Sequence, residues 1–290
     1  MTLLKVFVLA MIQGVAELLP VSSSAHVIVA EKLMGLDPTA PQMTLLLVML
    51  HTGTMFAVIF FFWDSWKVRF FASRKVFWES VKLIAAATVL TGFIGLLLKA
   101  LIEKFMLKGV AHAEIEMIFG NLDLIAVSLV AVGILILIAG LKDKRFLQKD
   151  NPLGFKASCL IGAVQGVCLP FRGFSRSGAT ISTGLLLGIE KKMVEDFSFA
   201  LAVVLTPPII IREVLRLLKA QQVSSSHGTS MLGLFFPSLI GMVLSFIFGV
   251  LALKWLSNWL ESGRWYLFGL YCLCASLGVF VLQFADIFPH

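Results

Sequence analysis

Two segments, about half the chain apart, carry the polar residues whose types and spacing could do chemistry. The first holds Glu17, three consecutive serines (Ser22, Ser23 and Ser24) and His26. A carboxylate, hydroxyls and an imidazole in so short a segment can form an acid–base or nucleophile set. The second segment combines two arginines with hydroxyls, and its members are Arg172, Ser175, Arg176, Ser177 and Thr180. Arginine beside hydroxyls favours an oxyanion ligand such as phosphate.

Arg176 has the most informative surroundings in the second segment. Ser175 and Ser177 flank it, and Gly178 and Thr180 open an apolar stretch that we predict to be a helix. Guanidinium donors, hydroxyls and a helix N-terminus together are typical of a phosphate-binding site. An alternative is that Ser175 caps the helix while Arg176 extends to the membrane interface.

Glu17 follows Gln13 by four residues, so on a helix both side chains share one face. Pro20 would end that helix and place the serines and His26 beyond it. Glu17 could hold a divalent cation, Mg²⁺ or Ca²⁺, because hard cations prefer carboxylate and phosphate oxygens. In a purely structural alternative, Glu17 pairs with Arg176 or Arg172, the serines cap the next helix, and His26 is a satisfied helix histidine.

Two other polar pairs are weaker candidates. His51 and Thr52 lie inside an apolar stretch, where a hydrogen bond that lines a pocket is a simpler role than catalysis. Glu195 and Asp196 are typical of a helix start, where acidic groups favour the helix dipole.

The elements that position these residues are predicted to lie in a membrane. Of the 290 residues, 59% are hydrophobic and only 14% charged, against roughly 45–50% and 25% in soluble proteins. This composition argues against a water-soluble protein and excludes a disordered chain. The net charge of +7 comes from lysines and arginines scattered in short loops, which argues against a nucleic-acid partner.

Six segments are long and apolar enough to span a bilayer. They are 43–66, 77–101, 122–141, 194–219, 231–256 and 265–286. Two further apolar regions, 3–35 and 155–190, are interrupted by proline, serine, glycine and charged residues. We predict that each of these regions forms a re-entrant helical hairpin, because irregular backbone at membrane depth must be buried in protein or line a wet cavity.

The two interrupted regions share a local pattern. Gln13-Gly-Val and Gln165-Gly-Val are each followed by Leu-Pro and a serine cluster, and each region precedes three spans. This indicates an internal duplication within a single integral membrane domain, 1–290, with a first repeat over 1–141 and a second over 155–286. Three crossings per repeat invert the second relative to the first. The predicted fold is thus an all-α polytopic membrane protein with six transmembrane helices and two re-entrant hairpins in an inverted repeat.

The distribution of basic residues predicts the orientation. The loops 67–75 and 142–156 and the pair Lys191-Lys192 are rich in lysine and arginine and fall on one face, which should be cytoplasmic. The first hairpin then opens to the outer face.

The motifs resemble those of the undecaprenyl-diphosphate phosphatase family, the bacitracin-resistance type. They are Gln13-x-x-x-Glu17, Pro20-Val-Ser-Ser-Ser-Ala-His26 and Gly173-Phe-Ser-Arg-Ser-Gly-Ala-Thr180, with His51-Thr-Gly-Thr54 and Glu195-Asp-Phe-Ser-Phe-Ala-Leu-Ala202 in addition. The resemblance covers nearly the whole chain.

The resemblance implies a bacterial inner-membrane hydrolase. It would remove the terminal phosphate of a polyprenyl diphosphate at a site facing the outer side, recycle the lipid carrier of cell-wall synthesis and confer bacitracin resistance. The family's motif glutamate, serine and histidine correspond to Glu17, Ser23 and His26, and its Ser-Arg-Ser-x-x-Thr segment to Ser175 to Thr180. The oligomeric state, including a homodimer, stays open.

Two positions depart from the family pattern. Gln13 stands where many members have a first glutamate, which leaves Glu17 as the one carboxylate of that motif. Pro170-Phe-Arg-Gly173 stands where the family typically has Pro-Gly, and it adds Arg172 as a second cation.

The residues and the resemblance together predict a mechanism with defined alternatives. Arg176, Arg172, the hydroxyls of both segments and Gln13 would bind the substrate, and Glu17 would bind the cation or orient the attacking group. His26 is the first choice as nucleophile or acid–base, with Ser23 as the alternative. A flippase or transporter of polyprenyl phosphate is the competing function, because inverted repeats with broken helices also build secondary transporters.

Overall fold

The computed structural model describes residues 2–36, 41–105, 118–145, 151–223 and 231–284, and within these ranges the regular structure is helical. The helices are α1 Leu3–Leu18, α2 Ser23–Leu33, α3 Pro41–Arg69, α4 Arg74–Phe105, α5 Leu122–Arg145, α6 Phe155–Cys168, α7 Arg176–Leu186, α8 Lys191–Val223, α9 Met231–Glu261 and α10 Tyr266–Phe284. One isolated parallel bridge joins Asn151 and Ile189.

Five of these helices, α3, α4, α5, α9 and α10, are long and apolar enough to cross a membrane by length and composition. Each coincides with a span predicted from the sequence. The remaining predicted span, 194–219, falls within α8, part of whose side chains lie outside the described residues. Within the described residues, the all-helical class and five of the predicted apolar spans are confirmed, whereas a total of six crossings stays a prediction.

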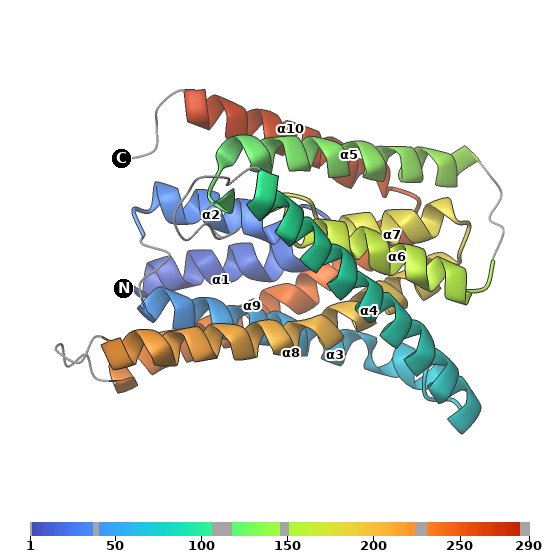
Figure 1. Ribbon diagram of the computed structural model, residues 1–290, viewed down its shortest axis with the longest axis horizontal. Helices are drawn as coiled ribbons and strands as arrows, with labels where there is room; N and C mark the ends of the chain where they lie inside the picture. The colour runs from blue at the N-terminus through green and yellow to red at the C-terminus, as the bar shows by residue number, and fades with distance from the viewer. Residues whose placement is uncertain (1, 37–40, 106–117, 146–150, 224–230, 285–290) are drawn as a thin grey trace.

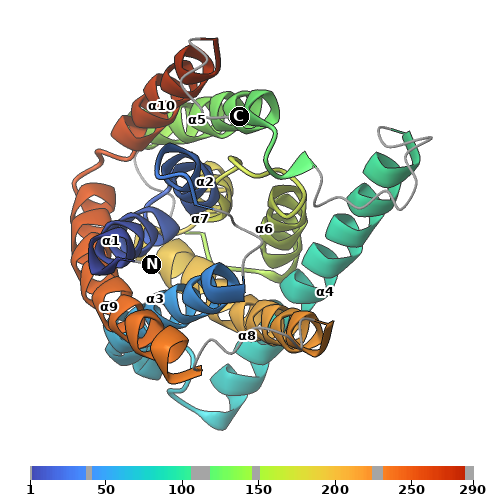
Figure 2. The ribbon, with the colours of Figure 1, turned by 90° about the vertical axis from the view of Figure 1, so that its left-hand side faces the viewer.

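Both interrupted regions form pairs of short helices. The region 3–35 folds as α1 and α2, and the region 155–190 folds as α6 and α7. In Figure 1 the two pairs extend from opposite ends of the molecule and approach each other near its middle, with long helices around them. Seen from the end in Figure 2, α1, α2, α6 and α7 lie inside a ring to which α4, α5, α9 and α10 contribute.

The two halves of the chain pack in a matched way. α1 packs on α9, and its counterpart in the second half, α6, packs on α4. The glycine of each Gln-Gly-Val segment lies at this contact. A Cβ on Gly14 would stand 2.8 Å from Phe248 of α9, and a Cβ on Gly166 would stand 2.7 Å from Ile94 of α4. Only glycine permits such close approach, which gives a physical reason for the repeated motif. The inverted repeat and its boundaries stay a prediction that these contacts support.

Candidate active site

The turn between α1 and α2 positions the first group of polar side chains. α1 ends at Leu18, and the backbone reverses through Ser22, whose φ of 67° lies in the left-handed region that disfavours a side chain. Strain of this kind persists where the surroundings fix it and is found at functional sites. The turn brings Ser23 into contact with Glu17 and places His26 in the first turn of α2, and all three side chains are partly exposed.

The turn before α7 positions the second group. Gly173 has a φ of 106°, which glycine adopts readily, and a Cβ there would stand 2.5 Å from the carbonyl oxygen of Ile125. The hydroxyl of Ser175 accepts a hydrogen bond from the amide of Gly178 at 3.3 Å and so caps α7. Arg176 is the first residue of that helix, where backbone N–H groups lack intrahelical partners.

The two turns meet at an ion pair. A terminal nitrogen of Arg176 lies 3.0 Å from Oε1 of Glu17, and the two side chains are only 20% and 17% exposed. The hydroxyl of Ser23 donates to Oε2 of the same carboxylate, and the amide of Gln13 donates to it at 3.3 Å. Residues 159 positions apart in sequence thus form one polar cluster. We call Gln13, Glu17, Ser23, His26 and Arg176 the hairpin-tip site.

His51 reaches this site from α3. Its Nδ1 lies 2.9 Å from the amide nitrogen of Gln13 and 3.9 Å from Oε2 of Glu17. An amide nitrogen only donates, so Nδ1 of His51 accepts here. A hydrogen bond of His51, as the sequence predicted, is therefore present, and it brings the imidazole next to the Glu17 carboxylate.

His26 is held at both ring nitrogens. Its Nδ1 lies 2.7 Å from the carbonyl oxygen of Ser22, and its Nε2 lies 2.7 Å from the hydroxyl of Tyr271 in α10. The rings of His26 and Tyr271 stack with centroids 5.7 Å apart. His26 thus lies in α2, across the turn from Glu17 in α1, and one of its ring nitrogens contacts a side chain from the far end of the sequence.

The other predicted residues take several positions around this site. Ser24 lies 3.4 Å from Ser22, hydroxyl to hydroxyl, and Ser177 donates to the carbonyl of Leu19 at 3.3 Å, which ties the two turns together. Thr180 is buried, with its hydroxyl 2.6 Å from that of Ser198 and 2.9 Å from the carbonyl of Arg176. Its function in this geometry is to hold the start of α7 against α8, and direct contact with a substrate stays a prediction.

Arg172 lies against an aromatic ring from the segment that precedes α5. Its guanidinium carbon lies 4.3 Å from the ring centroid of Phe119, a cation–π arrangement. Substrate binding by Arg172 likewise stays a prediction.

The hairpin-tip site offers few protein ligands for a metal ion. Among the described residues, no group of three His, Cys, Asp or Glu side chains could enclose one. Glu17 is the one carboxylate of the hairpin-tip site, and its Oε1 meets only a single guanidinium nitrogen in the contacts above. Since a carboxylate oxygen has two lone pairs, Oε1 can accept a further ligand. This arrangement fits a Mg²⁺ ion that arrives with substrate phosphates, which is the usual mode for Mg²⁺.

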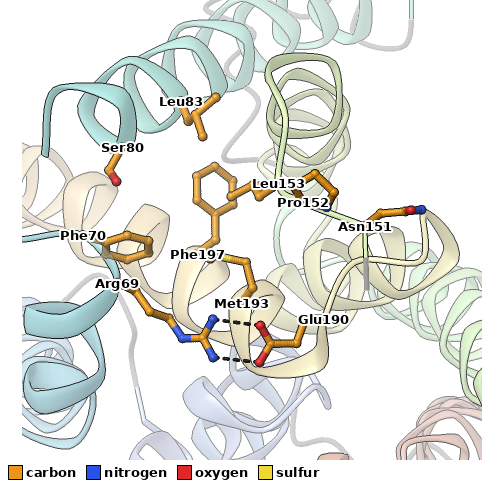
Figure 3. A pocket seen from close by; sticks show the side chains of 10 residues that line it. All are labelled: Arg69, Phe70, Ser80, Leu83, Asn151, Pro152, Leu153, Glu190, Met193 and Phe197. Atoms are coloured by element: carbon orange, nitrogen blue, oxygen red, sulfur yellow. Dashed lines mark hydrogen bonds and ion pairs between the residues drawn. The ribbon is translucent and has the colours of Figure 1, made fainter. Parts of the chain in front are cut away.

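A second charged cluster lies where α3 ends and α8 begins. Both terminal nitrogens of Arg69 meet the Glu190 carboxylate, at 2.9 and 2.7 Å, as Figure 3 shows, and its Nε lies 3.0 Å from Asp196. We call Arg69, Glu190 and Asp196 the Arg69 cluster. Arg69 and Glu190 line a cavity of about 270 Å³ whose walls also include Phe70, Leu83, Leu153, Met193 and Phe197.

The residues around the Arg69 cluster are strongly tied to one another. Ser65 donates to Asp196 at 2.6 Å, Ser257 donates to Glu195, and Lys192 lies 3.4 Å from Glu195. Glu195 and Asp196 are fully buried. Hydrogen bonds from Arg69 hold the pKa of the Glu190 carboxyl below its ordinary value of 4.5. The sequence prediction that Glu195 and Asp196 mark a helix start is incomplete, because they follow the start of α8 yet serve as buried partners of other helices.

Sequence reasoning missed Tyr271 in the active-site region. The chain has 25 phenylalanines and only 2 tyrosines. A hydroxylated ring inside an apolar span is therefore an exception that could have singled out Tyr271, because a phenol near the membrane core needs a polar partner.

The fold and the site together define a multi-pass membrane protein with a polar cluster suited to a phosphorylated ligand. The chain belongs to the family described as bacitracin resistance protein BacA, which it matches over residues 6–278.

Named relatives agree with this assignment. "Undecaprenyl-diphosphatase 2" of Acinetobacter baylyi is 57% identical over 95% of this chain and 96% of the relative. "Undecaprenyl-diphosphatase 2" of Burkholderia thailandensis is 34% identical over 93% and 92% of the two chains. "Undecaprenyl-diphosphatase" of Rhodopirellula baltica is 30% identical over 97% and 98%. The similarity to these diphosphatases thus extends over almost the entire chain.

Proposed function

We propose that this protein hydrolyses undecaprenyl diphosphate to undecaprenyl phosphate and inorganic phosphate. The family and the names of its relatives support this reaction. The observation that carries it is the contact of Glu17 with Arg176 at 3.0 Å, which joins the two interrupted hairpins amid hydroxyls and an imidazole. The reaction recycles the lipid carrier of peptidoglycan synthesis and confers bacitracin resistance.

Arg176 and the N-terminus of α7 bind the terminal phosphate in this proposal. The negative phosphate competes with Glu17 for the guanidinium, while Ser175 and Ser177 shape the backbone that presents the first N–H groups of α7. Phosphoryl transfer depends mainly on neutralising charge and positioning the attacking group. Fixed donors inside a largely buried site therefore supply most of the acceleration.

His26 is the proposed nucleophile or acid–base group, with Ser23 as the alternative. Nδ1 of His26 faces a carbonyl oxygen, so Nε2 is the nitrogen that can take part in the reaction. Ser23 donates to Glu17, an arrangement in which the carboxylate could accept the hydroxyl proton. Trapping a phosphorylated residue in a single turnover separates these roles, because attack by water leaves no phosphorylated protein.

A divalent cation, Mg²⁺ or Ca²⁺, is proposed to accompany the diphosphate. Glu17 would contribute the protein ligand, and the phosphate oxygens would contribute others. When bound, the cation would neutralise phosphate charge. Activity that is abolished by EDTA and restored by Mg²⁺ tests this point.

The proposed placement is a bacterial inner membrane with the site open to the outer side. One observation supports this placement: Arg69 of the loop 67–75, Asn151 of the loop 142–156 and Glu190, next to Lys191, line the same cavity. Positive loops face the cytoplasm, so the hairpin α1–α2 opens outward. Six crossings and two re-entrant hairpins complete this proposed topology.

Phosphate release from undecaprenyl diphosphate by the purified protein in detergent tests the function. We expect release by the wild type and by Glu261→Ala, an exposed control, and loss of release in Glu17→Ala. Inactive wild-type protein that moves polyprenyl phosphate across a vesicle membrane would instead establish the transporter.

A further inference from the structure

The His26 ring is fixed in one orientation by two elements that are far apart in sequence. Its Nδ1 lies 2.7 Å from the carbonyl oxygen of Ser22, and its Nε2 lies 2.7 Å from the Tyr271 hydroxyl, 245 residues away. The two rings are close to parallel, with an interplanar angle of 16°. Stacking and a short hydrogen bond together fix the position of the Tyr271 hydroxyl relative to the His26 ring.

The hydrogen-bond partners determine the tautomer of the neutral ring. A carbonyl oxygen only accepts, so Nδ1 carries the proton, and Nε2 presents its lone pair to Tyr271. The phenol therefore donates to Nε2. Any phosphorus atom or proton that is to reach the lone pair must first replace the Tyr271 hydroxyl.

We propose that Tyr271 is a substrate-contacting residue of the hydrolytic site. The terminal phosphate of the diphosphate displaces the Tyr271 hydroxyl from Nε2 of His26, and the phenol then donates its hydrogen bond to a non-bridging phosphate oxygen. This inference rests on the proposed function, because it requires a diphosphate at the hairpin tips.

The position of Tyr271 permits this exchange of partners. Its side chain is 47% exposed, so the ring can turn without opening the core. Its neighbour Cys272 is fully buried and donates to the carbonyl of Pro20 at 3.3 Å. The backbone of α10 is thus held against the turn between α1 and α2. A phosphate that takes the place of the hydroxyl lies within hydrogen-bond reach of the same phenol.

Tyr271→Phe is the sharpest variant, because it removes the hydroxyl and retains a ring that can stack on His26. The chain has one other tyrosine, Tyr266, also in α10, so Tyr266→Phe is a matched control. The measurements are kcat and KM for undecaprenyl diphosphate and the inhibition constant of inorganic phosphate. Thermal unfolding in detergent checks that both variants are folded.

We expect Tyr271→Phe to reduce kcat/KM roughly tenfold to a hundredfold, since a hydrogen bond to a charged group is lost. Inhibition by inorganic phosphate should weaken in the same variant and stay unchanged in Tyr266→Phe. If Tyr271→Phe matches the control in all three constants, the proposal is overturned. A fall in kcat with unchanged phosphate inhibition would also overturn it and would assign Tyr271 only to positioning His26.

Failure of the proposed function gives a different result. In that case the wild type itself releases no phosphate, and the inference falls with its premise. An active wild type with unaffected Tyr271→Phe refutes only the role of Tyr271.

Discussion

The hairpin-tip site and the Arg69 cluster both join an arginine to acidic side chains from distant parts of the sequence, but they use the arginine differently. All three side-chain nitrogens of Arg69 are engaged, two by Glu190 and one by Asp196. Arg176 meets Glu17 through one terminal nitrogen. Asp196 is fully buried, whereas Glu17, Ser23 and His26 are partly exposed.

The difference supports the proposed role of the hairpin-tip site in ligand binding and a structural role for the Arg69 cluster. An arginine shared by two carboxylates has little capacity left for an anion, and its removal would leave buried charge without a partner. A single contact amid partly exposed hydroxyls can be exchanged for a phosphate. Burial and ion pairing alone therefore do not distinguish the proposed binding pair, Glu17 and Arg176, from the Arg69 cluster. The difference between them is the unused hydrogen-bonding capacity of Arg176.

The largest expected effect is that of Arg176→Ala. We expect phosphate release to fall roughly 100- to 1000-fold, the loss typical of removing one donor that stabilises transition-state charge. Arg264→Ala, at an exposed turn, is the control and should keep wild-type activity. Assays of the purified proteins measure this, and activity of Arg176→Ala near that of the control would remove Arg176 from the site.

Arg69→Ala is expected to act on stability instead of catalysis. Breaking a buried ion pair by removing one partner costs about 3–5 kcal/mol, because the other charge remains buried. The thermal midpoint in detergent should fall clearly, while phosphate release per folded molecule is retained. A stable but inactive Arg69→Ala protein would contradict the distinction between the two clusters.

Gln13→Glu should sharpen the role of the cation. A second carboxylate beside Glu17 adds a hard oxygen ligand, so the Mg²⁺ concentration for half-maximal activity should fall about tenfold. Titration of EDTA-treated protein with Mg²⁺ gives the value. Gln13→Ala is the control, because it removes the amide without adding charge. An equal change of the half-maximal Mg²⁺ concentration in both variants would show that the added carboxylate does not bind the cation.

The smallest effect is expected from Glu190→Gln. The pKa of Glu190 is below its ordinary value of 4.5 in the folded protein, so the Arg69 contact stabilises the fold above that pH and is lost as the pH falls through the folded-state pKa. Glu190→Gln should lack this part of the acid-induced decrease in thermal midpoint. Parallel melting curves at neutral pH and below pH 4.5 measure it, and identical decreases in both proteins would show that the pair contributes nothing.

The sequence predicted those features that depend on local pattern. Apolar length located the spans, and interruption by Pro20 and the serines located a hairpin that the structure forms as α1 and α2. Glu17 and Arg176 stood out because charge is costly in a membrane, and they do meet.

What the sequence could not supply were partners from remote helices. Tyr271 approaches His26 only because α10 packs beside the first hairpin, a tertiary contact without a local signal. In the sequence Arg69 is one basic residue among several in a loop, and its ion pair with Asp196 depends on the packing of α3 against α8. The same tertiary packing turns Glu195 from a helix-start residue into a buried partner of Ser257.

The central claim is tested most directly by phosphate release per folded molecule in the double variant Glu17→Gln with Arg176→Gln. Two amides can keep a neutral hydrogen bond between the hairpins, so the protein should remain folded with a thermal midpoint near that of the wild type. We predict that its phosphate release from undecaprenyl diphosphate falls at least as far as that of Arg176→Ala. Wild-type release from this folded double variant would contradict the account, because the pair would then be structural.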